Sequence, residues 1–139
     1  MPFRFAWRDE DQTVMQLIVE GGDWNWRDYH HVARACTFSM LRLPHPVHML
    51  IDLRGSTREK MPAGAAVHVR SFGKIQTPAM SGKAVVIGYP QPDLAELGLG
   101  PSQTLSTRDG TVYFVASEDE AEALFNQWRA EFAQGQEDA

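Results

Sequence analysis

The chain has 139 residues, of which 43% are apolar and 22% are charged, and its formal net charge is −5. These values are typical of one globular domain and argue against a general nucleic-acid binder, which would carry an excess of basic residues. The single cysteine allows no internal disulfide, no apolar run approaches the roughly 18 residues that span a bilayer, and the first residues lack signal-peptide features, so we expect a cytoplasmic protein without a membrane span.

The first third of the chain predicts a hairpin followed by a capped helix. Residues 3–7 alternate apolar and polar side chains and residues 14–19 follow after a charged turn, which is typical of two antiparallel strands. Asn25 and Asp28 have the spacing of a capping box at the start of a helix. Pro44 should end that helix, because the residue before a proline avoids helical geometry.

The middle of the chain predicts two buried strands with a helix between them. Residues 47–53 and 84–88 are short apolar runs, and the second is continuous, as expected for a strand that is covered on both faces. The helix should begin near Pro62, since proline is favoured at the first helical position. Ala65 to Phe72 supplies its apolar face, and Pro78 should end it.

The last third predicts a weak helix at residues 93–99, a strand at 111–115 and a long final helix. Ser117 and Glu120 have the spacing of a capping box for the final helix, whose apolar residues recur at helical spacing. Beyond Gln134 the chain is polar, and we expect it to fray.

These elements predict a single α/β domain over residues 1–134, with a polar tail at 135–139. Their order, ββαβαβαβα, predicts a mixed, mostly parallel, five-stranded sheet with helices packed against it. Right-handed crossovers would bring the loops after the third and fourth strands to the same end of the sheet.

The loop after the strand at 47–53 is the expected position of a site, because strand C-termini and helix N-termini converge there in open α/β sheets. Asp52 and Arg54 lie at the end of this strand. The carboxylate can accept from N–H groups of the loop, and the guanidinium can hold an anion. The alternative is that Asp52 only stabilises the geometry of the loop.

A basic segment begins in the same loop and carries a local charge of +5 between Arg54 and Lys83, with Glu59 as its only acid. Such a segment can steer an acidic partner, or it can simply be a solvated surface. Its basic members are Arg54, Arg58, Lys60, Arg70, Lys74 and Lys83.

No catalytic or metal-binding motif is recognisable in the chain. Residues 81–83 fail the P-loop pattern, and no GxSxG sequence is present. His30 and His31 are adjacent and point about 100° apart on a helix. His45 and His48 have no ligand-spaced cluster beside them. We therefore predict no enzymatic activity, no metal and no cofactor.

The element order and three segments carry a resemblance to a known family. Residues 24–29 open the first helix, residues 49–53 form the third strand, and residues 113–121 join the fifth strand to the last helix. Over residues 3–132 this pattern resembles the STAS domains, which are named for sulfate transporters and anti-sigma-factor antagonists. It is also similar to their relatives with the topology of CRAL-TRIO-like lipid carriers.

Phosphorylatable STAS domains carry a serine at the start of the second helix, and its phosphorylation switches partner binding. The corresponding residues 61–64 of this chain contain no hydroxyl group. Ser56 and Thr57 lie upstream in the loop and are the candidate phosphorylation sites. The alternative is that their hydroxyl groups satisfy nearby backbone groups.

The resemblance implies a non-catalytic regulatory or protein-interaction domain that docks a protein partner through the loop after the third strand and the start of the second helix. The residues expected at this surface are Asp52, Arg54, Ser56, Thr57, Arg58 and Lys60. The alternative function is a carrier of a lipid or small apolar ligand, held between the helices and the sheet. The residues expected around that ligand are Met40, Phe72, Leu97 and Phe114. A homodimer is compatible with either function.

Overall fold

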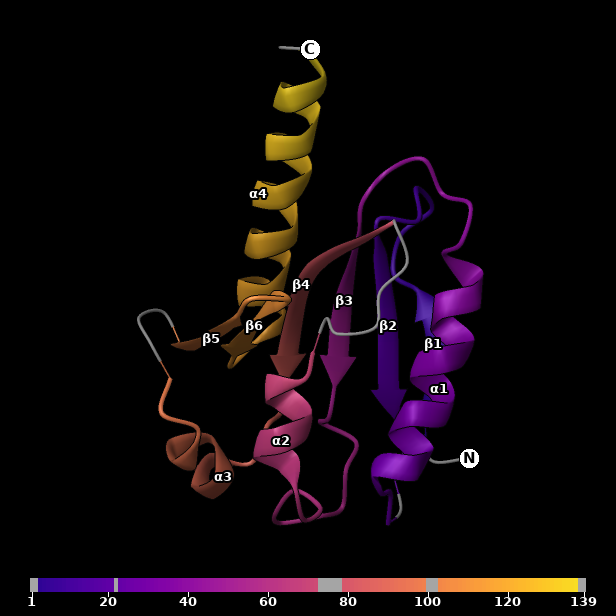
Figure 1. Cartoon of the computed structure of the whole chain (residues 1–139). Coiled ribbons are helices and arrows are strands. Elements are labelled where there is room, and N and C mark those ends of the chain that lie inside the picture. Colours follow the sequence, from indigo (N-terminus) through magenta and orange to yellow (C-terminus); the bar gives the residue numbers. More distant parts are fainter. Residues whose placement is uncertain (1–2, 22, 73–78, 100–102, 138–139) are drawn as a thin grey trace.

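Six strands form one sheet, and four helices cover it, in the part of the chain that the computed structural model describes: residues 3–21, 23–72, 79–99 and 103–137 (Figure 1). The strands are β1 (Phe3–Trp7), β2 (Val14–Val19), β3 (Val47–Asp52), β4 (Met80–Ile87), β5 (Thr104–Thr107) and β6 (Gly110–Val115). The helices are α1 (Trp26–Ser39), α2 (Ala65–Arg70), α3 (Gln91–Glu96) and α4 (Glu118–Glu137).

The sheet is mixed, with the strand order β1-β2-β3-β4-β6-β5. The central strands β2, β3, β4 and β6 run parallel, and each edge strand pairs antiparallel with its neighbour. The expected α/β class is confirmed, but the expected count of five strands is wrong, because the order is ββαβαβαββα. The additional strand β5 has only four residues, three of them hydroxyl-bearing, and so lacks the apolar pattern of a strand.

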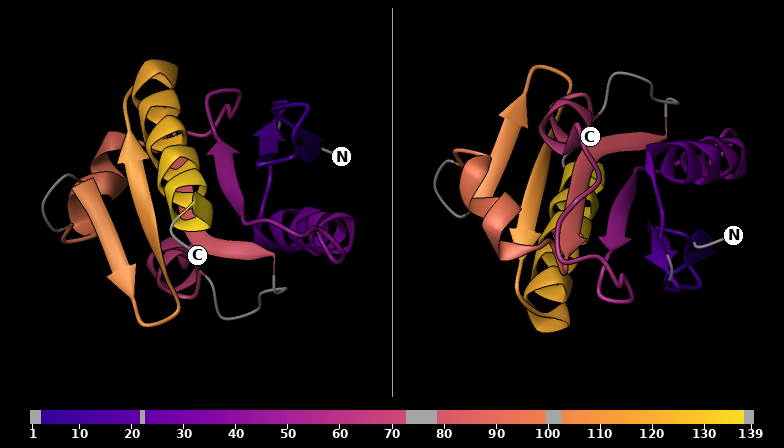
Figure 2. Two further views of the ribbon diagram at one scale, coloured as in Figure 1. Left: turned by 90° about the horizontal axis from the view of Figure 1, so that it is seen from above. Right: turned by 90° about the horizontal axis from the view of Figure 1, so that it is seen from below.

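Side chains that alternate along each strand form two separate cores, one on each face of the sheet. In β3, Met49 and Ile51 belong to the core beneath α1 and α2, whereas Leu50 belongs to the core beneath α4. Figure 2 shows α4 on one side of the sheet and α1 with α2 on the other. Since helices cover both faces, the central strands are apolar throughout most of their length.

The capping box predicted for the first helix is confirmed at α1. Asn25 Oδ1 accepts from the Asp28 N–H at 3.0 Å, and Asp28 Oδ2 accepts from the Asn25 N–H at 3.1 Å. Cys36 lies on the inner face of this helix and is fully buried, and burial raises the pKa of its thiol to about 12. The thiol is therefore protonated at neutral pH and acts as a small core residue.

The second helix is shorter than the sequence predicts. It was expected to begin near Pro62, but α2 begins at Ala65, after Gly64 with a φ angle of 87°. The carbonyl groups before it are engaged elsewhere, because Trp26 Nε1 donates to the oxygens of Pro62 at 3.2 Å and Ala63 at 3.0 Å. These contacts hold the segment before α2 against α1 and outside the helix.

Two other boundaries differ from the prediction. Helix α3 covers Gln91–Glu96 instead of residues 93–99, and β4 begins at Met80 instead of Ala84. Pro78, the expected end of the second helix, lies outside the described residues.

The last helix begins as predicted. Ser117 Oγ accepts from the Glu120 N–H at 3.3 Å, while the Glu120 carboxylate accepts from the Ala116 N–H at 3.1 Å. The helix then continues to Glu137, through most of the segment that was expected to fray. No helix in the described ranges is both long and apolar enough to cross a membrane.

Replacing Phe125 with alanine should lower the free energy of unfolding by about 3–5 kcal/mol, because it removes a fully buried ring between α4 and the sheet. Phe38 is 69% exposed, so Phe38→Ala should change this free energy by less than about 0.5 kcal/mol. Urea unfolding followed by circular dichroism measures both. Equal losses in the two variants would contradict the assignment of Phe125 to the core beneath α4.

Candidate functional site

The loop after β3 lies where the parallel strands end, as the sequence predicts (Figure 1). The Leu53 N–H donates to the Ile87 oxygen at 2.9 Å, which extends the pairing of β3 and β4 to the last residues of both strands. Beyond this bond the segments that follow the two strands diverge. The segment after β3 continues into residues 54–64, and the segment after β4 leads to α3. Open α/β sheets place ligands in crevices formed in this way.

Gly88 allows the segment after β4 to contact the segment after β3. Its φ angle is 84°, in the left-handed region that favours glycine. A Cβ atom at this position would lie 2.8 Å from the Arg54 backbone nitrogen and 3.0 Å from Arg54 Cγ. A side chain at position 88 would therefore push the loop after β3 away from the end of β4.

A pocket of about 360 Å³ lies between these segments. Four of the six residues that the sequence analysis placed at the docking surface line it: Arg54, Ser56, Arg58 and Lys60. Asp52 and Thr57 do not line the pocket. The basic loop is thus folded around a concave surface at the end of the sheet.

Ser56 has a structural role in the wall of this pocket. Its Oγ accepts from Trp24 Nε1 at 2.9 Å and from the Arg58 N–H at 3.2 Å. Arg58 Nε in turn donates to the Trp24 backbone oxygen at 2.8 Å. This ring of hydrogen bonds agrees with the alternative interpretation of Ser56 as a loop-stabilising hydroxyl. The sequence analysis did not connect Trp24 with the site, because no local pattern links residues 32 positions apart.

Asp52 and Arg54 form an internal pair. Arg54 Nε donates to Asp52 Oδ1 at 3.0 Å, and Nη2 donates to Oδ2 at 2.8 Å. Partial burial acts to raise the pKa of Asp52, but the hydrogen bonds from the Arg54 side chain and N–H outweigh it, so the pKa lies below the ordinary 3.8. Arg54 Nη2 also lies 3.3 Å from Glu118 Oε1 on α4. The guanidinium is therefore committed to two carboxylates of its own chain.

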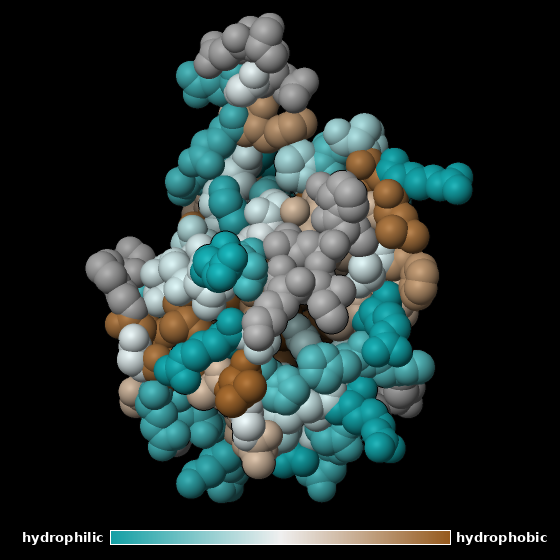
Figure 3. Space-filling model, in the orientation of Figure 1, coloured by the Kyte–Doolittle hydropathy of each residue, from teal (hydrophilic) through white to brown (hydrophobic). Residues whose placement is uncertain are grey.

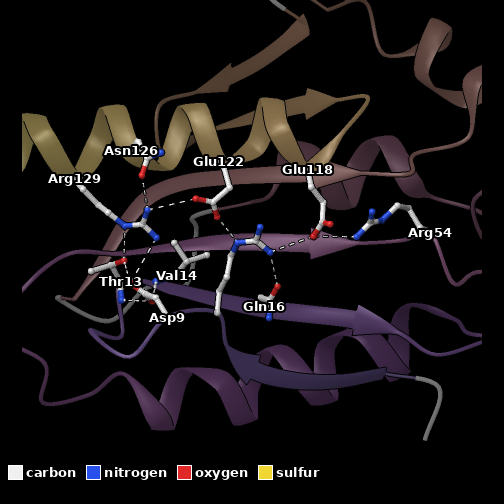
Figure 4. A network of polar contacts seen from close by, with 10 residues as sticks. Asp9, Thr13, Val14, Gln16, Arg54, Glu118, Glu122, Asn126 and Arg129 are labelled. Carbon is white, nitrogen blue, oxygen red and sulfur yellow. Dashed lines mark hydrogen bonds and ion pairs between the residues drawn. The ribbon is translucent and has the colours of Figure 1, made fainter.

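The Arg54–Glu118 contact is one end of a polar network along α4 (Figure 4). Arg8 lies between Glu118 and Glu122, at 3.4 Å and 2.6 Å from their carboxylate oxygens. Arg129 ends the network, where its Nε donates to Thr13 Oγ1 at 2.9 Å. The network ties α4 to β2 and to the loop after β1, beside the core that α4 covers.

Among the described residues, Arg58 and Lys60 are the cations of the pocket that have no close ion pair. Arg58 Nε lies 4.0 Å from Asp23, whose side chain is 90% exposed, so this pair is weak. Lys60 is exposed and has no ion pair among the described residues. The face in Figure 3 is mostly hydrophilic at its lower end, where α2 and the loop before it lie.

The other described members of the basic segment, Arg70 and Lys83, do not line this pocket. Lys74 lies outside the described residues, and Arg70 lies at the end of α2. Lys83 lies within β4, where its Nζ is 3.8 Å from Glu131. Among the described residues, the positive charge of the site therefore comes from the loop.

The apolar space that the described residues leave between the helices and the sheet is too small for a lipid. The apolar space between the helices and the sheet has a volume of about 40 Å³, and Phe72 is the one residue expected around a ligand that lines it. Met40, Leu97 and Phe114 are buried in the core. Pockets for small ligands usually have volumes of about 300–1,000 Å³.

The histidines are dispersed. His30 Nε2 lies 2.9 Å from His68 Nδ1 across α1 and α2, whereas His48 is buried on the opposite face. No three His, Cys, Asp or Glu residues in the described part of the chain are grouped so that they could hold a metal ion.

Comparisons with protein-family models, with curated proteins and with solved structures found no match for this chain. The resemblance to STAS domains therefore stays a prediction. The features that bear on function are the pocket after β3, the side chains of Arg58 and Lys60, and the ring of hydrogen bonds that shapes the pocket wall.

Gly88→Ala should lower the free energy of unfolding by about 1–3 kcal/mol, because it combines a strained φ angle with a backbone clash. Gly98 is the matched control: its φ angle is 64°, but a Cβ atom there would meet nothing within 4 Å. Gly98→Ala should therefore lower the free energy of unfolding by less than Gly88→Ala does. Urea unfolding of the two variants measures the difference, and an equal or larger loss at Gly98 would contradict the close contact described at Gly88.

Asp52→Asn should lower the free energy of unfolding at pH 7 by about 1 kcal/mol, a small value because Arg54 is half exposed. A carboxyl group with a lowered pKa in the folded state stabilises the protein above its unfolded-state pKa and loses this effect as the pH falls through its folded-state pKa. The difference between wild type and variant should thus be constant near neutrality and shrink below pH 3.8.

Urea unfolding at neutral and at acidic pH measures this difference, with Asp11→Asn as the control. Asp11 is exposed, and its substitution should change the free energy of unfolding by less than about 0.5 kcal/mol. A wild-type-to-variant difference at Asp52 that grows as the pH falls would show that the Asp52–Arg54 pair does not stabilise the fold.

Proposed function

We propose that this chain is a non-catalytic interaction domain, of the regulatory type that STAS-like proteins represent, and that it docks an acidic segment of a protein partner in the pocket after β3. The observation that carries the proposal is the pocket of about 360 Å³ lined by Arg58 and Lys60, neither of which has a close ion pair among the described residues. A partner carboxylate bound there would gain charge-assisted hydrogen bonds.

The pocket wall has a fixed shape, which supports the proposal that it binds a protein partner. The ring of hydrogen bonds among Trp24, Ser56 and Arg58 holds the loop in one conformation before a partner binds. A preorganised loop reduces the entropy that is lost on association. Gly88 also helps to fix the conformation of the loop, because it lets the loop pack against the end of β4.

The proposal assigns different roles to the residues first expected at the surface. Arg58 and Lys60 contact the partner, Ser56 shapes the wall, and Asp52 with Arg54 connects the loop to α4. Ser56 Oγ is held inside the loop by the hydrogen bonds from Trp24 Nε1 and the Arg58 N–H, so we propose partner docking without a phosphorylation switch at this residue.

The alternative function, a carrier of a lipid or small apolar ligand, has less support. The apolar space of about 40 Å³ is far below the volume of such ligands, so the helices of the described chain would have to move apart before one could enter.

Charge reversal tests the docking proposal. The wild-type chain is immobilised, and proteins captured from an extract of the source cell are quantified by mass spectrometry. An acidic partner should be recovered at least about tenfold less with Arg58→Glu/Lys60→Glu, because two attractive charges become repulsive.

Arg108→Glu is the control, since Arg108 is exposed in the turn between β5 and β6, away from the pocket. It should leave the recovery of the partner unchanged. Circular dichroism should show that all variants are folded. If every captured protein bound the doubly reversed chain as well as the wild type, the surface would be wrong.

A further inference from the structure

A second pocket lies at the other end of the sheet, beside the starts of β3 and β4. Figure 1 shows that the C-terminal part of α4 extends beyond the strands at this end. Its volume is about 520 Å³, within the range of about 300–1,000 Å³ that is usual for small-molecule sites. Leu43, Pro46, Met80 and Phe132 supply apolar walls. The docking surface proposed above uses none of these residues.

A buried histidine lines this pocket. His48 is only 5% exposed, and it is the one histidine of the chain that is buried. Its Nδ1 lies 2.7 Å from Ser81 Oγ. Its other ring nitrogen, Nε2, has no hydrogen-bond partner within the described residues. Buried polar groups are usually paired, so a ring nitrogen left over beside a pocket is consistent with a ligand contact.

His48 is neutral at physiological pH. Burial, together with the charges of Lys83 and Arg129, lowers its pKa to about 4. Ser81 Oγ already accepts from the Lys83 N–H at 3.2 Å, so its hydroxyl hydrogen can be donated to His48 Nδ1. In this arrangement the ring proton is on Nε2, which makes that nitrogen a donor.

Lys83 supplies a positive charge at the same pocket. Its Nζ lies 5.1 Å from the centre of the Trp128 ring and 3.8 Å from Glu131 Oε2. The Glu131 side chain is 55% exposed, so this ion pair is weak and does not satisfy the ammonium group. The apolar walls thus surround the Lys83–Glu131 pair, a serine hydroxyl and an uncharged imidazole.

We propose that this pocket binds a small carboxylic acid with an apolar body. The carboxylate accepts from Lys83 Nζ and from the neutral His48 ring, and the apolar body lies against Leu43, Met80 and Phe132. A ligand carboxylate gives the ammonium a second counter-charge beside the half-exposed Glu131, whereas a neutral polar head gives it none.

Titration of the full chain with 1-naphthoate, and with the neutral 1-naphthalenemethanol, tests this proposal. Isothermal calorimetry should show saturable binding of one naphthoate per chain. The alcohol should bind at least about tenfold more weakly, since a hydrogen bond to a charged group contributes more than a neutral one. Amide resonances of residues 43–48 and 79–83 should shift in the NMR spectrum as naphthoate is added.

Lys83→Met should weaken naphthoate binding about tenfold or more and leave the affinity for the alcohol unchanged. Arg108→Met removes a positive charge in the turn between β5 and β6, outside both pockets, and should have no effect on either ligand. Ser81→Ala gives a second, smaller change at the pocket and should also weaken naphthoate binding.

Three results would overturn the proposal: no saturable binding of naphthoate, equal affinity for the alcohol, or resonance shifts confined to residues 53–60. None of these results bears on the docking surface after β3, because Arg58 and Lys60 do not line the pocket at His48.

Discussion

The close contact between Gly88 and the backbone of Arg54 is the constraint on which the candidate site depends. The parallel pairing of β3 and β4 ends at the hydrogen bond between Leu53 and Ile87, and without further contact the two chains would separate at once. Since position 88 has no side chain, the loop after β3 remains against the end of β4, and the pocket forms between them. The basic side chains of the loop then converge on one concave surface instead of extending into solvent.

Apolar burial and ion pairs contribute differently to the position of α4. The ion pairs along this helix involve side chains that are partly exposed, and each contributes at most about 1 kcal/mol. Phe125 and Trp128 are buried against the sheet, and full burial of one such side chain contributes about 1.5–3 kcal/mol. Apolar contacts therefore hold the helix on the sheet. Arg8 and Arg129 determine the alignment of α4, because their polar contacts fix the position of this helix relative to β2 and to the loop after β1.

Local signals in the sequence were sufficient for most of the fold. The capping boxes at Asn25 and Ser117 predicted the starts of α1 and α4, because a cap involves only neighbouring residues. Segment 104–107 was missed because it is short and polar and forms a strand only by pairing with β6. At the candidate site, the basic loop was predictable from its composition. The contacts of Trp24 with Ser56 and of Glu118 with Arg54 were not predictable, because they depend on how distant elements pack.

Among the described elements, α4 is the one that covers the second face of the sheet, and it follows all six strands in the sequence. Val14, Leu50, Val85 and Ile87 form the apolar surface under α4, and the polar bond from Arg8 to Glu122 spans 114 positions of the chain. During translation this surface has no cover until residues 118–137 leave the ribosome. Exposed apolar strands in such an intermediate favour aggregation, so chaperone binding to the nascent chain would be most useful in this interval.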